Sequence, residues 1–229
     1  MKSHLVLGVA AVCGPVLAGT VAVKVDLADV QAEIAPNIYG LGMEDVNHEI
    51  YGGLDAQRLY GESFEEAPKP FGGGNPIGAR LNVSGCWESL NAHPGELVHD
   101  TAVAHWGRAS QAMKPNGASV GMGNRGLGNA GIPVRKGRAL TGWLYARGSV
   151  GTLEVSLRPA KGGAAYAVQA LEAAPGEGWK RLEFRLVPTA DDPAARFAVT
   201  AFGYGTVWID DAYLADEPTN EFGRIGCRE

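Results

Sequence analysis

Short segments in which apolar and polar residues alternate fill most of the chain between residues 80 and 216. This period-two alternation places apolar side chains on one face of a β-strand. Clusters of glycine, proline and aspartate divide the segments at a spacing of roughly ten residues. Clear examples are Leu153-Val155-Leu157, Leu182-Phe184-Leu186 and Val207-Ile209. No helical pattern lies between the segments, which excludes a parallel α/β sheet and predicts a β-sandwich or barrel.

The N-terminal stretch follows a different pattern. Lys2 precedes an apolar run from Leu5 to Ala18 that ends in small residues, as a signal peptide does. The alternative is a buried first strand, but Gly8, Gly14 and Pro15 interrupt the run, and it lacks period-two alternation. Because the run is too short to span a bilayer stably, we expect export to a secreted or periplasmic location and no membrane association after signal removal.

The overall charge argues against nucleic acid as a partner. The chain has a formal net charge of −5 and a pI near 5.6, and its lysines and arginines are scattered singly. A mildly acidic protein is compatible with a neutral ligand such as a glycan. Outside the signal, Cys86 and Cys227 could pair in an oxidising compartment, although two cysteines do not define a disulfide framework or a metal site.

Two common motifs for cofactors or metals are not supported. Gly121, Gly123 and Gly126 form a literal GxGxxG, but no strand–helix–strand unit surrounds it. A glycine-rich loop of the sandwich is therefore expected there. The histidines lack the HxH or HExxH spacing of a catalytic zinc site.

A cluster of polar side chains, Glu44, Asp45 and Asn47, follows a short predicted strand. Residues 33–66 resemble the opening of the α-L-arabinofuranosidases of glycoside hydrolase family 51. The matching elements are Ile38-Tyr39-Gly40, Glu44-Asp45, Gly52-Gly53-Leu54 and Ser63-Phe64-Glu65. In that family this segment is the first strand of the catalytic β/α barrel, and the glutamate matching Glu44 binds the arabinofuranosyl hydroxyls. The resemblance implies that the polar cluster binds substrate; the alternative is an exposed acidic turn.

A weaker similarity continues through the predicted sandwich. Some members of the family carry a jelly-roll module after the first strand, similar to carbohydrate-binding modules for cellulose and xylan. The module begins with a Ser-Phe-Glu element and ends with an Ile-Asp-Asp strand, which match Ser63-Phe64-Glu65 and Ile209-Asp210-Asp211. The resemblance implies that Glu65 and Asp210 hold a structural calcium, a cation that takes oxygen ligands. The alternative is a pair of ordinary surface carboxylates.

The tryptophans divide into two groups by their surroundings. Trp87 and Trp106 lie beside polar or glycine-rich loops and are the candidate platforms for stacking on a sugar ring. Trp143 and Trp208 are central in apolar strands, so we expect them in the core.

These features predict a mainly β fold: a jelly-roll β-sandwich preceded by a short strand and loop that resemble the first strand of a β/α barrel. Four parts are expected along the chain. They are a signal peptide at 1–18, an N-terminal arabinofuranosidase-like segment at 19–60, a sandwich similar to carbohydrate-binding modules at 61–216 and a tail at 217–229.

The resemblance also implies what this chain supplies to catalysis. Retaining glycoside hydrolysis needs two carboxylates about 5 Å apart. In the family both are glutamates on later strands of a barrel of roughly 250 residues, which does not fit after Asp216. We expect glycan binding and one subsite for arabinose-containing polysaccharides or oligosaccharides, with no turnover by this chain alone and no catalytic cofactor. The alternatives are a free-standing secreted carbohydrate-binding module and a structural or adhesion sandwich that binds protein.

Overall fold

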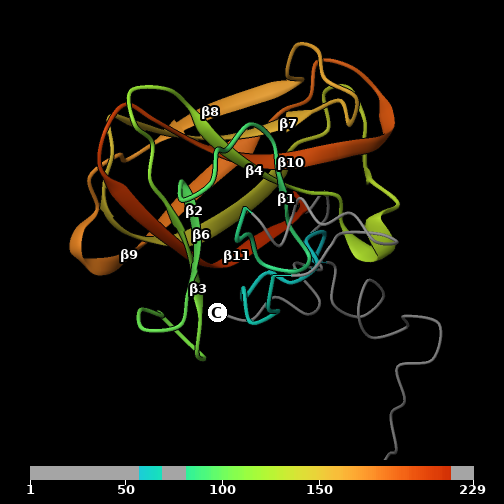
Figure 1. The fold of residues 1–229 in the computed structure, drawn as a ribbon. Helices are drawn as coiled ribbons and strands as arrows, with labels where there is room; N and C mark the ends of the chain where they lie inside the picture. Colours follow the sequence, from blue (N-terminus) through green and yellow to red (C-terminus); the bar gives the residue numbers. More distant parts are fainter. Residues whose placement is uncertain (1–56, 69–80, 218–229) are drawn as a thin grey trace, which may run out of the picture. The chain divides into compact units, whose positions relative to one another are not determined.

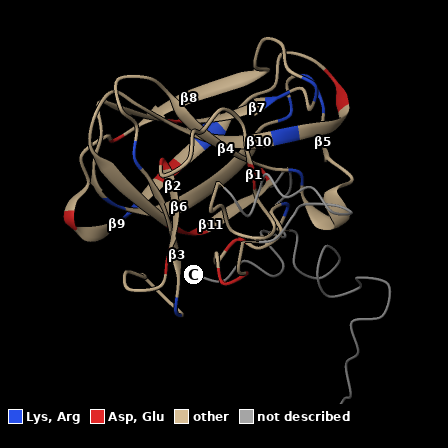
Figure 2. Cartoon of the chain, viewed as in Figure 1, with Lys and Arg blue, Asp and Glu red and all other residues tan. Residues whose placement is uncertain are grey.

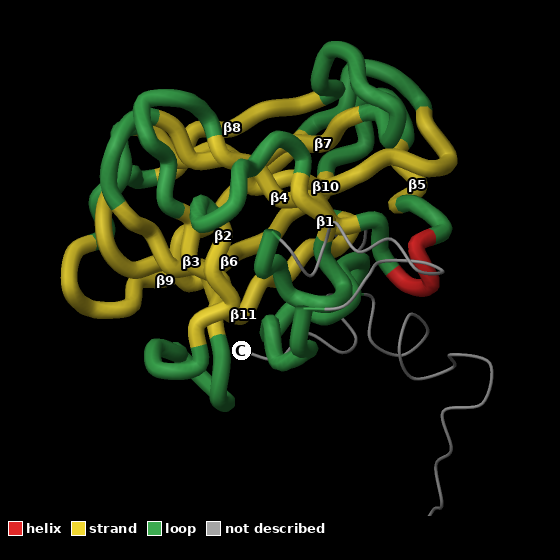
Figure 3. Tube along the Cα trace, in the orientation of Figure 1, coloured by secondary structure: helices red, strands yellow, loops and turns green. Residues whose placement is uncertain are grey.

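The computed structural model describes residues 57–68 and 81–217, all of which belong to one compact unit, Asp45–Glu229. Two antiparallel sheets make up most of this part of the chain, and they stack face to face (Figure 1). Figure 3 shows that strands and loops dominate, with one short 3-10 helix, η2 (Leu127–Asn129), among the described residues. Within the same residues, no helix has the length and apolar character needed to cross a membrane.

The first sheet has six strands in the order β1-β4-β10-β7-β8, with β5 paired to β10. Its strands are β1 (Glu88–Ser89), β4 (Val120–Asn124), β5 (Ile132–Val134), β7 (Thr152–Arg158), β8 (Ala167–Leu171) and β10 (Asp192–Phe202). We call it the β10 sheet.

The second sheet has five strands in the order β2-β3-β11-β6-β9. Its strands are β2 (Leu97–Asp100), β3 (Ser110–Met113), β6 (Leu140–Ser149), β9 (Gly176–Leu186) and β11 (Thr206–Asp216). We call it the β6 sheet. Consecutive strands are repeatedly placed in opposite sheets, and the two antiparallel layers confirm the predicted mainly β sandwich.

The core lies between the two sheets. Every second residue is buried along most of β6 and in the second half of β9, whereas β4 is buried along its whole length. On β6, Leu140 and Leu144 are 1% and 0% exposed, while Thr141 and Trp143, which point to the opposite face, are only half-buried. On β9, Leu182 and Phe184 point into the same core. Phe184 stacks on Phe197 of β10, with ring centroids 5.5 Å apart, so the two sheets are joined by aromatic as well as aliphatic packing.

The segment at 57–66 is part of the sandwich. It runs beside the second half of β11, beyond the end of β3, and supplies the hydrogen bonds that β3 no longer makes. The N–H of Arg58 donates to the carbonyl of Leu214 at 2.7 Å, and the N–H of Ala212 donates to the carbonyl of Glu62 at 3.0 Å. Leu59 is fully buried in the core. The predicted boundary between residues 60 and 61 therefore falls inside a continuously packed segment.

Candidate functional site

The outer face of the β6 sheet carries a cluster of aromatic side chains. Alternation along β6 turns Trp143 and Tyr145 away from the core, and the register of β11 places Tyr213 directly opposite Trp143. The two rings stack with centroids 5.6 Å apart and planes at 12°. Trp143 also meets Tyr145 edge to face at 5.8 Å. These contacts hold the rings in fixed orientations on an outward-facing surface.

Cations from neighbouring positions lie against the aromatic rings. The guanidinium of Arg181, on β9, lies 4.9 Å from the centroid of Trp143 and forms an ion pair with Glu183 at 3.3 Å. Further along the same face, Arg147 lies 6.0 Å from the centroid of Trp208. Apolar ring surface and hydrogen-bonding groups thus alternate across the sheet.

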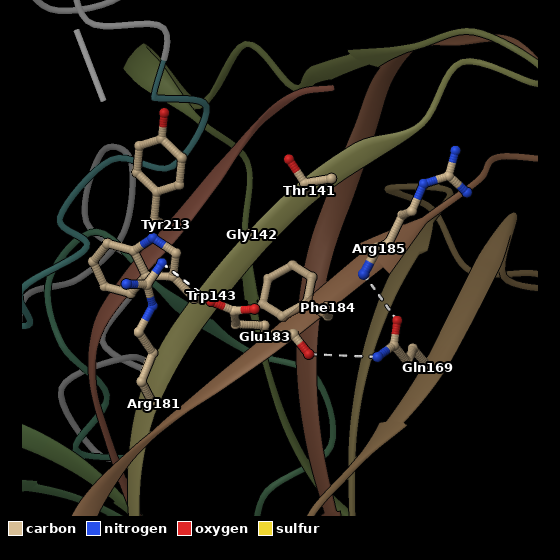
Figure 4. Close-up of a pocket in the computed structure, with 9 residues that line it drawn as sticks. All are labelled: Thr141, Gly142, Trp143, Gln169, Arg181, Glu183, Phe184, Arg185 and Tyr213. Atoms are coloured by element: carbon tan, nitrogen blue, oxygen red, sulfur yellow. Dashed lines mark hydrogen bonds and ion pairs between the residues drawn. The ribbon is translucent and has the colours of Figure 1, made fainter. Parts of the chain in front are cut away.

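A pocket of about 360 Å³ opens on this face, and its size lies at the lower end of the range typical of small-molecule sites. Figure 4 shows Trp143 between Tyr213 and Arg181 on one side of the pocket, and Arg185 with Gln169 on the other. Gln169 comes from β8 of the opposite sheet. Its side chain reaches β9 of the β6 sheet, where its amide oxygen accepts a hydrogen bond from the backbone N–H of Arg185 at 2.9 Å. The pocket therefore lies where the edges of the two sheets meet.

An ion pair fixes the charged rim of the pocket. Arg185 donates two hydrogen bonds to Glu217, at 2.6 and 2.8 Å. The hydrogen bonds from Arg185 lower the pKa of Glu217, and the same bonds raise the pKa of Arg185. Both side chains are half-exposed, so they stay available to polar groups of a ligand.

The loop between β2 and β3, residues 101–109, crosses the outer face of the β6 sheet. Its His105 ring stacks on Tyr145, with centroids 3.7 Å apart, and meets Trp179 edge to face at 5.7 Å. The Nδ1 atom of His105 is hydrogen-bonded to Asp211 at 2.8 Å. The loop forms one wall beside the aromatic cluster and displays Trp106, whose side chain is 76% exposed.

Two carboxylates hold this β2–β3 loop through its backbone. Glu65 accepts the N–H groups of Arg108 and Ala109 at 2.7 and 3.1 Å. Asp210 accepts those of His105 and Trp106 at 2.7 and 3.3 Å. Both residues were predicted as calcium ligands, and the structure brings both to the same loop.

Asp210 has an unusual environment for an acid. Its side chain is fully buried, and this burial raises its pKa to about 7, although the hydrogen bond from the N–H of His105 acts in the opposite direction. Calcium takes six to eight oxygen ligands. Among the described residues, no three His, Cys, Asp or Glu side chains gather into a group that could hold a metal ion. The calcium site therefore stays a prediction, and backbone oxygens would have to supply the ligands that Glu65 and Asp210 do not.

Comparisons with known proteins place this geometry in a family context. No family model matches the chain. It is 32% identical over 185 residues to an extracellular exo-α-L-arabinofuranosidase of Streptomyces chartreusis, covering 78% of this chain and 20% of that protein. It is 26% identical over 191 residues to α-L-arabinofuranosidase 1 of Arabidopsis thaliana, covering 77% of this chain and 26% of that protein. The chain is a relative of the α-L-arabinofuranosidases.

A solved structure agrees with this relationship. The arabinose-bound MgGH51 α-L-arabinofuranosidase superposes with a TM-score of 0.59 at 24% identity, covering 78% of this chain and 29% of that one, which shows the shared fold. The chain therefore resembles family 51, as its sequence indicated. It spans between a fifth and a third of the length of the proteins that it matches.

The residues predicted from the sequence to bind substrate differ in where they lie. Glu44, Asp45 and Asn47 lie outside the described residues. Trp106 is accessible, and its role as a platform stays a prediction. Trp87 is 1% exposed, so a sugar cannot stack on it. Its Nε1–H donates to the carbonyl of Gly61 at 2.8 Å, and its ring stacks on Phe64 and meets Phe197 edge to face, so the indole is enclosed in the core.

Two other tryptophans were wrongly expected in the core. Trp143 and Trp208 are half-buried on the outer face of the β6 sheet. The signal that could have found Trp143 is its phase: it alternates with Leu144 and shares the polar phase of Thr141 and Arg147. Arg181 and Gln169, which line or border the pocket, had no signal in the sequence, because their place depends on pairing between distant strands.

Proposed function

We propose that the chain binds arabinose-containing plant polysaccharides or oligosaccharides on the outer face of the β6 sheet, as the N-terminal part of a secreted α-L-arabinofuranosidase-type glycoside hydrolase. The observation that carries the proposal is the pocket beside Trp143 and Tyr213, which combines aromatic surface with arginine, glutamine and hydroxyl groups. Sugars present apolar C–H faces and many hydroxyls, and such a mixed lining suits both.

The family relationship supports the choice of ligand. The names of the curated relatives specify α-L-arabinofuranosidase activity, and one of them is described as extracellular. In this proposal Glu44 adds one arabinofuranosyl subsite, and the sandwich adds binding along the polymer. The chain by itself gives no turnover, so measurable hydrolysis of an aryl arabinofuranoside by the purified chain would contradict this part.

Affinity electrophoresis in gels containing arabinan or arabinoxylan tests the binding. The wild-type chain should be retarded. Trp143→Ala should weaken binding roughly tenfold or more, because removing a central aromatic contact costs at least about 1.4 kcal/mol. Arg181→Gln provides a second pocket variant at an exposed position. Tyr204→Ala is the control, since Tyr204 is 73% exposed in the turn between β10 and β11, away from the pocket.

The outcomes separate the proposed function from its alternatives. If the wild-type chain is retarded and Trp143→Ala, Arg181→Gln and Tyr204→Ala are retarded equally, binding through this face is contradicted. Absence of retardation on every plant polysaccharide would favour a structural or adhesion sandwich. Retardation that is unchanged in Glu44→Gln, together with unchanged binding of arabino-oligosaccharides, would favour a free-standing binding module.

We also propose that calcium stabilises the β2–β3 loop between Glu65 and Asp210. The two carboxylates supply the negatively charged oxygens that calcium prefers, and the buried carboxylate of Asp210 has no cationic side chain hydrogen-bonded to it among the described contacts. Calcium would contribute fixed geometry to the loop that displays Trp106.

A further inference from the structure

Three arginines lie in one row on the outer face of the β10 sheet. Arg196 of β10 and Arg158 of β7 are direct cross-strand partners. Their neighbours Phe197 and Leu157 are fully buried, so the two arginines point to the opposite, outer face. Arg125 directly follows Asn124, the partner of Phe197, and the antiparallel register therefore places Arg125 on the other side of Arg196. Figure 2 shows basic segments beside each other on β7 and β10.

The row carries more positive charge than the described chain neutralises. Like charges directly opposite each other on a sheet are destabilising. Arg196 forms an ion pair with Glu88 at 2.7 Å, whereas no ion pair within the described ranges involves Arg125 or Arg158. The Nε atoms of all three arginines are buried, and none has a hydrogen-bond acceptor in the part of the chain that the structure describes. Buried donors without acceptors and neighbouring like charges are both costly, so an anionic group bound over the row would stabilise the arrangement.

The sheet beneath the row holds the central arginine in place. A Cβ atom on Gly123 would lie 2.6 Å from Cδ of Arg196, so the absence of a side chain at Gly123 leaves room for Arg196 to lie flat on the sheet. As a result the side chain of Arg196 is only 13% exposed, in contrast to a solvated surface arginine. The carbonyl of Pro159 accepts a further hydrogen bond from Arg196. Arg196 is therefore pre-positioned, whereas the guanidinium of its neighbour Arg158 forms no ion pair among the described residues.

We propose that this arginine row binds the carboxylate of a uronic acid unit in an acidic polysaccharide. The guanidinium group is planar and pairs with a carboxylate through two parallel hydrogen bonds, which lysine cannot reproduce. Cross-strand neighbours have Cβ atoms about 5 Å apart, so two guanidinium groups can hold one carboxylate. The inference rests on the proposed function for the glycan nature of the ligand, and it adds a second site with a different charge requirement on the opposite sheet.

Isothermal titration of the full chain with oligogalacturonates tests the proposal, with Arg158→Gln as the variant. Arg138→Gln is the matched control, because it removes the same charge from an exposed position in the turn before β6. Wild type should bind oligogalacturonate, and binding should disappear when the ligand is methyl-esterified. Arg158→Gln should bind about ten- to a hundredfold more weakly, as expected for a lost charge-assisted hydrogen bond. Arg158→Lys should restore only part of the affinity, and Arg138→Gln should bind like wild type.

Titration with neutral arabino-oligosaccharides runs alongside. Equal losses in Arg158→Gln and Arg138→Gln would show non-specific charge attraction and overturn the proposal, as would binding that survives methyl esterification. If the wild type binds neutral arabino-oligosaccharide but not oligogalacturonate, only the arginine site fails. If it binds oligogalacturonate in the predicted manner but no neutral ligand, the binding proposed for the β6 sheet fails and the arginine site stands. Thermal unfolding of each variant confirms that the folded chain is titrated.

Discussion

The buried carboxyl group of Asp210 should make the stability of this chain depend on pH in a way that one substitution removes. The side chain is fully buried, and burial raises its pKa to about 7, from an ordinary value of 3.8. The folded chain therefore holds this proton more tightly than the unfolded chain does. The resulting stabilisation is fully present below about pH 4 and is lost as the pH rises through about 7.

The size of the effect follows from the two pKa values. The difference corresponds to about 4 kcal/mol in the free energy of unfolding between pH 4 and pH 8. Asp210→Asn removes the titrating group and also weakens the hydrogen bonds to His105, Trp106 and Asp211, because one carboxylate oxygen becomes an NH₂ group. That loss does not depend on pH. The stability of the variant relative to wild type should therefore increase by about 4 kcal/mol from pH 4 to pH 8.

Urea unfolding followed by tryptophan fluorescence measures this difference. Wild type and Asp210→Asn should be unfolded at several pH values between 4 and 8, in EDTA, because a bound cation would keep the carboxylate ionised. Titrating groups that do not interact with Asp210 contribute equally to both proteins and cancel in the comparison. A difference that stays constant within about 1 kcal/mol, or that decreases as the pH rises, would show that burial does not raise the pKa of Asp210 in the folded chain.

Three further predictions concern the fold and the loop. Gly131→Ala should destabilise the chain by at least about 2 kcal/mol, because Gly131 has φ of 98° and a Cβ atom there would lie 2.3 Å from Cα of Ala194. Gly137→Ala is the control: Gly137 has φ of 77° but open space around it, so this change should cost about 1 kcal/mol. Equal losses of unfolding free energy in urea would contradict the close contact between Gly131 and Ala194. Calcium at a hundredfold excess over its Kd should raise the free energy of unfolding by about 2.7 kcal/mol relative to EDTA. An unchanged thermal midpoint would show that Glu65 and Asp210 only accept hydrogen bonds from backbone N–H groups and bind no calcium. Trp208→Phe should raise the pKa of Asp100, because the hydrogen bond from Trp208 is the main cause of the lowered pKa of Asp100. A carbon-13 NMR titration measures this pKa, and an unchanged value would contradict the hydrogen bond between the two side chains.

The alternation of side chains predicted the sandwich because each inner strand has one buried face. On β6 and β9 the buried leucines and Phe184 follow the period of two without interruption, and this local pattern is visible in the sequence. The same alternation places Trp143 on the outer face, because Trp143 is next to the inward-facing Leu144. It was instead expected in the core on its apolar character alone, which does not distinguish the two faces of a strand.

Other parts of the candidate site depend on contacts between segments that are distant in the sequence. Trp87 is surrounded by polar and glycine-rich neighbours, yet Phe64 and Phe197 enclose it from far along the chain. Glu65 and Asp210 were predicted from a resemblance, but their shared contact with the β2–β3 loop needs the fold to bring them together. The arginine row on the β10 sheet is scattered in the sequence, and only strand register assembles it.

The outer face of the β6 sheet is the proposed binding surface for arabinose-containing glycans. An NMR titration of the indole N–H signals with arabino-oligosaccharides tests it most directly, because the five tryptophans occupy different surroundings. The signals of Trp143 and Trp179 should shift saturably, and that of Trp87, which is 1% exposed and hydrogen-bonded to Gly61, should stay in place. If Trp143 and Trp179 show no saturable shift, whether the ligand binds elsewhere or does not bind at all, arabinose-containing glycans do not bind to this face.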